Sequence, residues 1–256
     1  MQWQLLFVSL IAVAGSRAAV AGSAEENLYR KAIGNIIRTS FEAAGTVEGT
    51  QGRKLALVLR HTLRDGRRTV IEVTAPAEFR GQRWLIVDED GAADKIWHFD
   101  AKTKRTREVP EEQWNAPWLG TDFTLSDFLL PDPGAYTYEL GGDENIGGET
   151  FTVIRLAPKD KEKDRFAVRV YSVDPRGGRL VRALFFDQQG RAVRRWIAER
   201  TEQRSGEWFP AQQRVVDLTT QKSSLLTLSE FRYEPKLAAD AFDAKGLAAE
   251  PTPAPK

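Results

Sequence analysis

Few residues of this chain could carry out chemistry. It has no cysteine, which excludes disulfides, thiolate catalysis and cysteine-bound zinc, and it has only two histidines, His61 and His98. Two histidines cannot build a histidine-rich metal site, and both lie in the middle of predicted strands. An enzyme would need one of them, since the chain has no G-x-S-x-G or H-E-x-x-H motif. The sequence therefore predicts a protein that is not an enzyme and has no metal site.

The charged clusters are typical of solvated turns and do not indicate a binding site. Asp88-Glu89-Asp90 and Glu111-Glu112 lie in hydrophilic turns, and the basic run at residues 102–107 is interrupted by threonine. The 37 Lys and Arg residues nearly balance the 36 Asp and Glu residues, so no net field attracts nucleic acid. The sequence also has no glycine-rich phosphate loop. We expect no cofactor and no nucleic-acid partner.

The N-terminus predicts export. Residues 5–15 form an apolar run too short to span a bilayer comfortably, and Ala19-Val20-Ala21 fits a signal-peptidase site. Residues 1–21 are therefore expected to be a signal peptide that directs the chain to the periplasm. An uncleaved anchor is the alternative, because the segment before the apolar run has no Lys or Arg.

The elements that follow must position any binding site. Ser23 and Glu26 form a capping box for a helix with a broad apolar stripe, which Gly45 ends. From residue 46 to residue 233 apolar and polar residues alternate between turn signals, which predicts about ten antiparallel strands in hairpin order. So wide a sheet must curl or split to hide its apolar face. We expect one domain, residues 22–242, followed by a disordered Ala/Pro-rich tail, residues 243–256.

A short apolar segment, residues 120–130, interrupts the strands. Thr124 and Asp127 form a capping pair at the start of a predicted helix, and Pro131 and Pro133 end it. A helix that short is unstable alone, so it must lie on the concave face of the sheet. Two interpretations stay open: a connector that fills the core, or a lid over an apolar cavity.

The chain is rich in large apolar side chains, with seven tryptophans and thirteen phenylalanines. At roughly 25 cal/mol per Å² of buried apolar area, an acyl chain would gain several kcal/mol in a dry groove between sheet and lid. The same residues could form ordinary core, and a shift of one residue in a strand inverts its two faces. The residues expected to bind the ligand are, in the sheet, Leu57, Leu59, Ile71, Val73, Trp97, Phe99, Val168, Val170 and Phe185, and, at the mouth, Trp118, Leu119, Phe123, Phe128 and Leu129.

Several local patterns together resemble a known family. They are DKIWHF at residues 94–99 with KRTR at 104–107, GTDF at 120–123 with Asp127, FTVIRLAPK from residue 151, LVRALFFDQQGR at 180–191 and WFP at 208–210. Over nearly the whole chain that follows the leader, the sequence resembles the LolA-like outer-membrane lipoprotein-sorting proteins.

The resemblance implies a fold that is mainly β with α (α+β): a curved antiparallel sheet forming an incomplete, half-open β-barrel closed by an N-terminal helix and short lid helices. It also implies an apolar cavity that shelters acyl chains in the periplasm. Carriers of this family accept lipoproteins from an inner-membrane transporter and pass them to an outer-membrane receptor. Other members serve other apolar cargo, some of them alongside exporters.

Two functions are therefore considered. The first is a monomeric periplasmic carrier or chaperone that binds the acyl chains of a lipid or lipoprotein and shuttles it toward the outer membrane, with an inner-membrane transporter or exporter as partner. The alternative is a periplasmic sensor or interaction module of the same fold that binds a membrane-protein partner. Lipid bound to the purified protein would favour the first.

Overall fold

The structure, a computed structural model, describes residues 23–36, 39–50, 52–63, 66–88, 93–162, 164–204, 207–237 and 239–249. The expected signal peptide, residues 1–21, and the last part of the expected tail, residues 250–256, lie outside the described residues. Within the described part of the chain, none of the helices combines the length and the apolar character needed to cross a bilayer.

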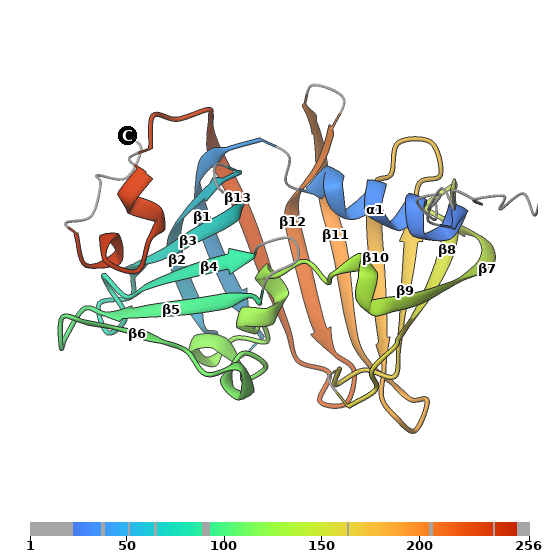
Figure 1. Ribbon diagram of the computed structural model, residues 1–256, viewed down its shortest axis with the longest axis horizontal. Coiled ribbons are helices and arrows are strands. Elements are labelled where there is room, and N and C mark those ends of the chain that lie inside the picture. The colour runs from blue at the N-terminus through green and yellow to red at the C-terminus, as the bar shows by residue number, and fades with distance from the viewer. Residues whose placement is uncertain are drawn as a thin grey trace, which may run out of the picture.

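The strands of the described residues form one antiparallel sheet (Figure 1). Its order is β6-β5-β4-β3-β2-β1-β13-β12-β11-β10-β9-β8-β7, so the first and last strands of the chain pair in the middle. The strands are β1 (Phe41–Gly49), β2 (Lys54–Thr62), β3 (Arg67–Ala75), β4 (Arg83–Asp88), β5 (Lys95–Asp100), β6 (Arg105–Glu108), β7 (Tyr136–Ile146), β8 (Glu149–Pro158), β9 (Val168–Val173), β10 (Leu180–Phe186), β11 (Ala192–Arg204), β12 (Glu207–Asp217) and β13 (Ser223–Tyr233).

The sheet is curved and does not close, which confirms the expected mainly β fold with a half-open barrel (Figure 1). Its two edge strands, β6 and β7, are consecutive in the sequence but lie at opposite ends of the strand order. Residues 109–135, here called the lid segment, connect these edges and therefore pass from one side of the sheet to the other. The lid segment holds four short 3-10 helices: η1 (Glu111–Gln113), η2 (Trp118–Gly120), η3 (Leu125–Phe128) and η4 (Pro133–Ala135).

One α-helix, α1 (Ala24–Ile36), packs on the same face of the sheet as the lid segment, against β7, β9, β10 and β12. That face is called the inner face. Ser23 caps the helix, since its Oγ accepts a hydrogen bond from the Glu26 backbone N–H at 3.2 Å. Tyr29, Ala32 and Ile33 form its buried stripe. The predicted helix is thus confirmed at its start.

The predicted end of this helix at Gly45 is wrong. Residues from Phe41 onward form β1, which pairs with β2 on one side and β13 on the other. Phe41 and Ala43 are buried on the inner face. Pairing with strands that are close only in three dimensions decided the conformation here, and local apolar spacing could not reveal it.

The predicted disorder of the tail is wrong for residues 243–249. After β13 the chain forms η5 (Ala239–Phe242) and η6 (Gly246–Ala248), which pack on the opposite, outer face of the sheet. Phe242 and Leu247 are buried there against Val70, Leu85 and Phe99. These two apolar side chains anchor a segment whose composition is otherwise typical of disorder.

Candidate binding cavity

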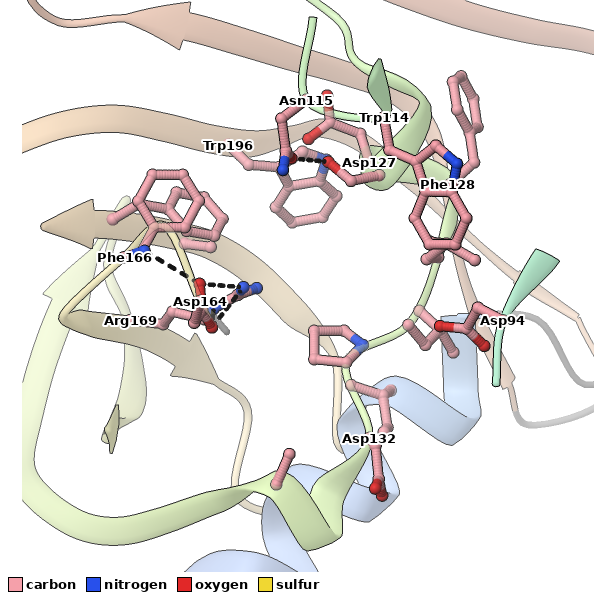
Figure 2. Close-up of a pocket in the computed structure, with 18 of the residues that line it drawn as sticks. Asp94, Trp114, Asn115, Asp127, Phe128, Asp132, Asp164, Phe166, Arg169 and Trp196 are labelled. Atoms are coloured by element: carbon pink, nitrogen blue, oxygen red, sulfur yellow. Dashed lines mark hydrogen bonds and ion pairs between the residues drawn. The ribbon is translucent and has the colours of Figure 1, made fainter. Parts of the chain in front are cut away.

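A cavity of about 620 Å³ lies between the inner face of the sheet, α1 and the lid segment (Figure 2). This volume falls within the roughly 300–1,000 Å³ typical of small-molecule sites. Side chains from most of the strands contribute to its wall, because the curved sheet wraps around it. The apolar wall from the helix, the sheet and the loop before β9 includes Ile33, Phe41, Leu59, Phe166, Leu180, Ala183, Phe185, Trp196, Phe209, Leu226 and Leu228.

The lid segment contains the predicted capping pair. The backbone N–H of Thr124 donates to Asp127 Oδ2 at 2.7 Å, and the Thr124 hydroxyl donates to the same oxygen at 3.0 Å. The helix that this pair starts is only the 3-10 turn of η3, and the chain is extended again at Leu129. The helix expected over the apolar segment is therefore shorter than predicted.

Three polar contacts tie the lid segment to well-separated strands. Arg194 of β11 forms an ion pair with Asp127. The backbone N–H of Leu130 donates to Asp88 Oδ2 of β4 at 2.9 Å. On β13, Ser224 Oγ accepts from the Asp122 backbone N–H at 2.9 Å. The lid segment is thus fastened to both halves of the sheet.

The lid segment both fills core and lines the cavity. Trp118 and Phe123 are buried, and the Trp118 ring meets the Trp84 ring of β4 edge-on at 5.2 Å between centroids. Phe128 and Leu129 are only partly buried, and both line the cavity; Figure 2 shows Phe128 there. The interpretation as a connector that fills the core therefore applies to Trp118, and the interpretation as a lid over the cavity applies to Phe128 and Leu129.

The expected ligand-binding residues fall into three groups. Five of them line the cavity: Leu59, Phe123, Phe128, Leu129 and Phe185. Five belong to the inner-face core beside it: Leu57, Ile71, Val73, Trp118 and Leu119. The remaining four, Trp97, Phe99, Val168 and Val170, do not line it.

The last group was assigned to the wrong face. On β5, Phe99 is buried and Trp97 partly buried on the outer face, beneath the C-terminal segment. On β9, Arg169 and Tyr171 line the cavity, so Val168 and Val170 alternate to the other side. Both strands carry apolar residues on each face, and one residue of shift exchanges the faces.

Sequence reasoning missed several cavity residues. Phe41 was placed in a helix, and no face was assigned to β11, β12 or β13. The available signal was the alternation of apolar residues in those three strands. Pairing these strands with their neighbours in the sheet would have shown which of their residues face the cavity. The missed residues are Phe41, Phe166, Arg169, Tyr171, Trp196, Phe209, Leu226 and Leu228.

One wall of the cavity carries a buried ion pair. Arg169 donates to Asp164 through Nε at 3.2 Å and through Nη2 at 3.0 and 2.8 Å. Asp164 also accepts from the Tyr136 hydroxyl at 2.8 Å and from the Phe166 backbone N–H at 3.0 Å. Burial opposes the charge of Arg169, but Tyr171, Tyr136 and Asp164 outweigh it and raise its pKa. Both members of this pair therefore already have hydrogen-bonding partners within the cavity wall.

Asp94 lines the cavity on the other side, near Asp132 of the lid segment (Figure 2). Burial raises its pKa to about 6, and the nearby carboxylate of Asp88 adds to the shift, while Arg67 opposes it. Asp94 is therefore a cavity carboxylate whose pKa is raised toward neutral pH.

Neither histidine lines the cavity. His61 is fully buried with Nδ1 2.9 Å from Thr69 Oγ1, and burial together with Arg67 lowers its pKa to about 3. The His98 ring stacks on Trp84 at 4.6 Å, and its Nε2 lies 2.6 Å from Gln82 Oε1. Across the described ranges, no group of three or more His, Asp and Glu side chains is arranged to hold a metal ion.

Solved structures define the class of fold. A domain from Vibrio parahaemolyticus described as an outer membrane lipoprotein-sorting protein has a TM-score of 0.80 at 18% identity, over 88% of this chain and 98% of its own. A DUF1329 family protein from Desulfovibrio piger has a TM-score of 0.77 at 20% identity, over 88% and 98%. A LolA superfamily protein from Nitrosomonas europaea has a TM-score of 0.65 at 19% identity, over 86% and 97%. The protein has the LolA-like fold, which confirms the resemblance.

A match to a protein-family model shows the family to which the chain belongs. A family model described as "-like: Uncharacterized protein" matches residues 65–249, which is well over half of the chain, and the protein belongs to that family. No curated protein matches the chain.

Proposed function

We propose that this protein is a periplasmic carrier that binds the acyl chains of a lipid or lipoprotein beneath the lid segment and takes them toward the outer membrane. The observation that carries the proposal is the open, largely apolar cavity of about 620 Å³ between the sheet and the lid segment. Binding consists of burial of the chains, with no covalent step. The protein is accordingly not an enzyme.

The driving force is the removal of methylene groups from water. Each methylene group buried in the cavity contributes about 0.8 kcal/mol. The protein side gains as well, because Phe128 and Leu129 are only partly buried where they line the cavity and would be covered by a ligand. A chain lying along the wall would touch Phe185 and Leu59 from distant strands at once.

The fold supports the same proposal. The LolA superfamily and lipoprotein-sorting structures share this open sheet. In the proposed cycle an inner-membrane transporter or exporter loads the protein as a monomer, and the lid segment shields the chains from water during transit. The expected signal peptide supplies the route to the periplasm.

Extraction of bound lipid from the purified full chain, followed by mass spectrometry, tests the proposal directly. A second test fills the cavity. Ala183 of β10 is buried and lines the cavity, so Ala183→Trp should weaken the binding of a fluorescent fatty acid at least tenfold. Leu184→Trp is the matched control on the same strand, because Leu184 does not line the cavity.

Lipid that co-purifies with the protein and a loss of fatty-acid binding confined to Ala183→Trp support the carrier. Protein that yields no lipid and does not bind the fatty acid rules the carrier out. Cross-linking of such empty protein to the periplasmic domain of a membrane protein would favour the alternative, a sensor or interaction module.

A further inference from the structure

The wall around the Asp164–Arg169 pair carries a further arginine, Arg165. Arg165 lines the cavity directly beside this pair in the sequence. Its guanidinium lies over the Phe166 ring, 4.5 Å from the centroid, and it makes no hydrogen bond or ion pair to any other described residue. Arg165 is exposed to solvent, and within the described part of the chain no carboxylate forms an ion pair with it.

The two nearest carboxylates are engaged elsewhere. Asp164 is held by Arg169, the Tyr136 hydroxyl and a backbone N–H. Asp127 is held by Arg194 and by Thr124. Since each of these two carboxylates already has an arginine of its own, neither forms an ion pair with Arg165.

The guanidinium of Arg165 is available to bind an anion. Burial, reinforced by Arg194 and Arg169 and opposed by Asp127 and Asp164, lowers the pKa of Arg165 to about 10, so the side chain is still charged at neutral pH. Because Arg165 is also exposed to solvent, an incoming anion can reach its guanidinium and pair with it. A guanidinium fork also matches the two oxygens of a carboxylate or phosphate.

The opposite wall makes the site directional. Asp94 and Asp132 lie across the cavity from Asp164 and Arg169 (Figure 2). Their carboxylates repel an anion from that side. An amphiphile in the cavity would therefore place its negative end at Arg165 and its chain along the apolar wall.

We propose that Arg165 binds the anionic headgroup, a carboxylate or a phosphate, of an amphiphile whose acyl chain occupies the cavity. This inference rests on the proposed function and names the class of its ligand. Arg165 acts as a specificity-determining residue, because the cavity wall selects for a chain and the guanidinium selects for negative charge beside it.

The test compares a pyrene-labelled fatty acid with its methyl ester on the full chain. The two probes have the same chain and differ in charge. Arg165→Gln should weaken the fatty acid about tenfold or more and leave the ester within about twofold, since a charged hydrogen bond is lost only with the acid. Arg165→Lys should retain part of the affinity. The control is Arg176→Gln, which removes an exposed arginine outside the cavity.

Competition separates the two sources of negative charge. Displacement of the labelled acid by palmitate assigns a carboxylate, and displacement by lysophosphatidylglycerol assigns a phosphodiester. The melting temperature of Arg165→Gln should equal or exceed that of the wild type, because Arg165 is exposed and makes no hydrogen bond or ion pair to another described residue. A lower melting temperature together with equal losses for acid and ester would indicate a structural role and overturn the assignment.

The inference and the proposed function fail in different ways. If the wild type binds the acid and the ester and Arg165→Gln changes neither, the headgroup assignment is wrong while the carrier stands. If the wild type binds neither probe, the carrier itself is wrong.

Discussion

Arg194 on β11 forms an ion pair with Asp127 in the lid segment, and this contact joins residues 67 positions apart in the sequence. Both side chains are largely buried, with 11% and 16% of their surface exposed. The same carboxylate holds the start of η3 through Thr124. One carboxylate therefore both holds the start of η3 and provides one of the polar attachments of the lid segment to the sheet.

The first prediction concerns this attachment. Arg194→Gln leaves the Thr124 contacts of Asp127 intact but removes the bond to the sheet. We expect a loss of about 1–2 kcal/mol in stability, since a largely buried carboxylate loses its charged partner. A bound fluorescent fatty acid should also dissociate several-fold faster, which stopped-flow displacement measures.

Arg191→Gln is the matched control for this prediction. Arg191 pairs with Asp187 in the β10–β11 hairpin, and its side chain is 73% exposed. Loss of an exposed pair of this kind costs less than about 1 kcal/mol and should leave the dissociation rate unchanged. Equal effects of the two substitutions would show that the Arg194–Asp127 pair does not hold the lid segment.

The second prediction follows from Asp94. Its folded-state pKa of about 6 lies above the ordinary value of 3.8, so between these values the folded protein holds a proton that the unfolded chain has released. This group therefore contributes stability at low pH that is lost as pH rises through about 6. Asp94→Asn should remove that slope and raise stability at pH 7 by about 1 kcal/mol, allowing for solvent screening of a half-buried group. Urea unfolding at pH 4, 5, 6 and 7 measures the pH dependence of stability and the stability at pH 7. An unchanged slope in Asp94→Asn would contradict the raised pKa of Asp94.

The third prediction concerns His61, whose stability contribution depends on pH in the direction opposite to that of Asp94. Burial and Arg67 lower the pKa of His61 to about 3, so below pH 6.5 the unfolded chain takes up a proton that the folded protein refuses. Stability due to neutral His61 is therefore lost as pH falls from about 6.5 toward 3. His61→Gln cannot titrate and should lose less stability on acidification, by a few kcal/mol at about 1.4 kcal/mol per pKa unit. Acid denaturation followed by circular dichroism checks this, and a wild-type acid midpoint in the variant would refute it.

Much of the fold could be predicted from the sequence because its signals are local. Leu55, Leu57 and Leu59 alternate with polar or smaller residues, and all three are buried on the inner face of β2. The Thr124–Asp127 pair likewise lies within one turn, so its spacing alone identified it.

The errors arose where partners distant in the sequence decide the outcome. Phe99 of β5 is buried on the outer face because Phe242 and Leu247 cover it from the far end of the chain. Phe41 belongs to a strand because β13, nearly two hundred residues away, pairs with it. No local period carries such information, and a strand that is apolar on both faces has no preferred register by itself.

The last prediction concerns a row of charges that the same long-range pairing creates on the outer face. Five side chains from β13, β1, β2, β3 and β4 alternate in sign across the sheet: Arg232, Glu42, Arg60, Glu72 and Arg83. Arg60 donates to Glu42 at 2.7 Å and to Glu72 at 3.0 Å, and all three are buried. At the end of the row, Arg83 donates to the Leu247 carbonyl at 2.6 Å, which links the row to the C-terminal segment.

Arg60→Gln should therefore destabilise the protein by about 3–5 kcal/mol, because it leaves two buried carboxylates without their shared cation. Arg232→Gln is a stringent control, since Arg232 also pairs with Glu42 but is 51% exposed, and its loss should cost no more than about 1 kcal/mol. Replacing Arg60 and Glu72 together with Met and Leu should recover most of the loss, because it removes one charge of each sign. Urea unfolding of the four proteins at pH 7 measures these differences. A cost for Arg60→Gln as small as that for Arg232→Gln would mean that water reaches the row, and the C-terminal segment would then not seal the outer face.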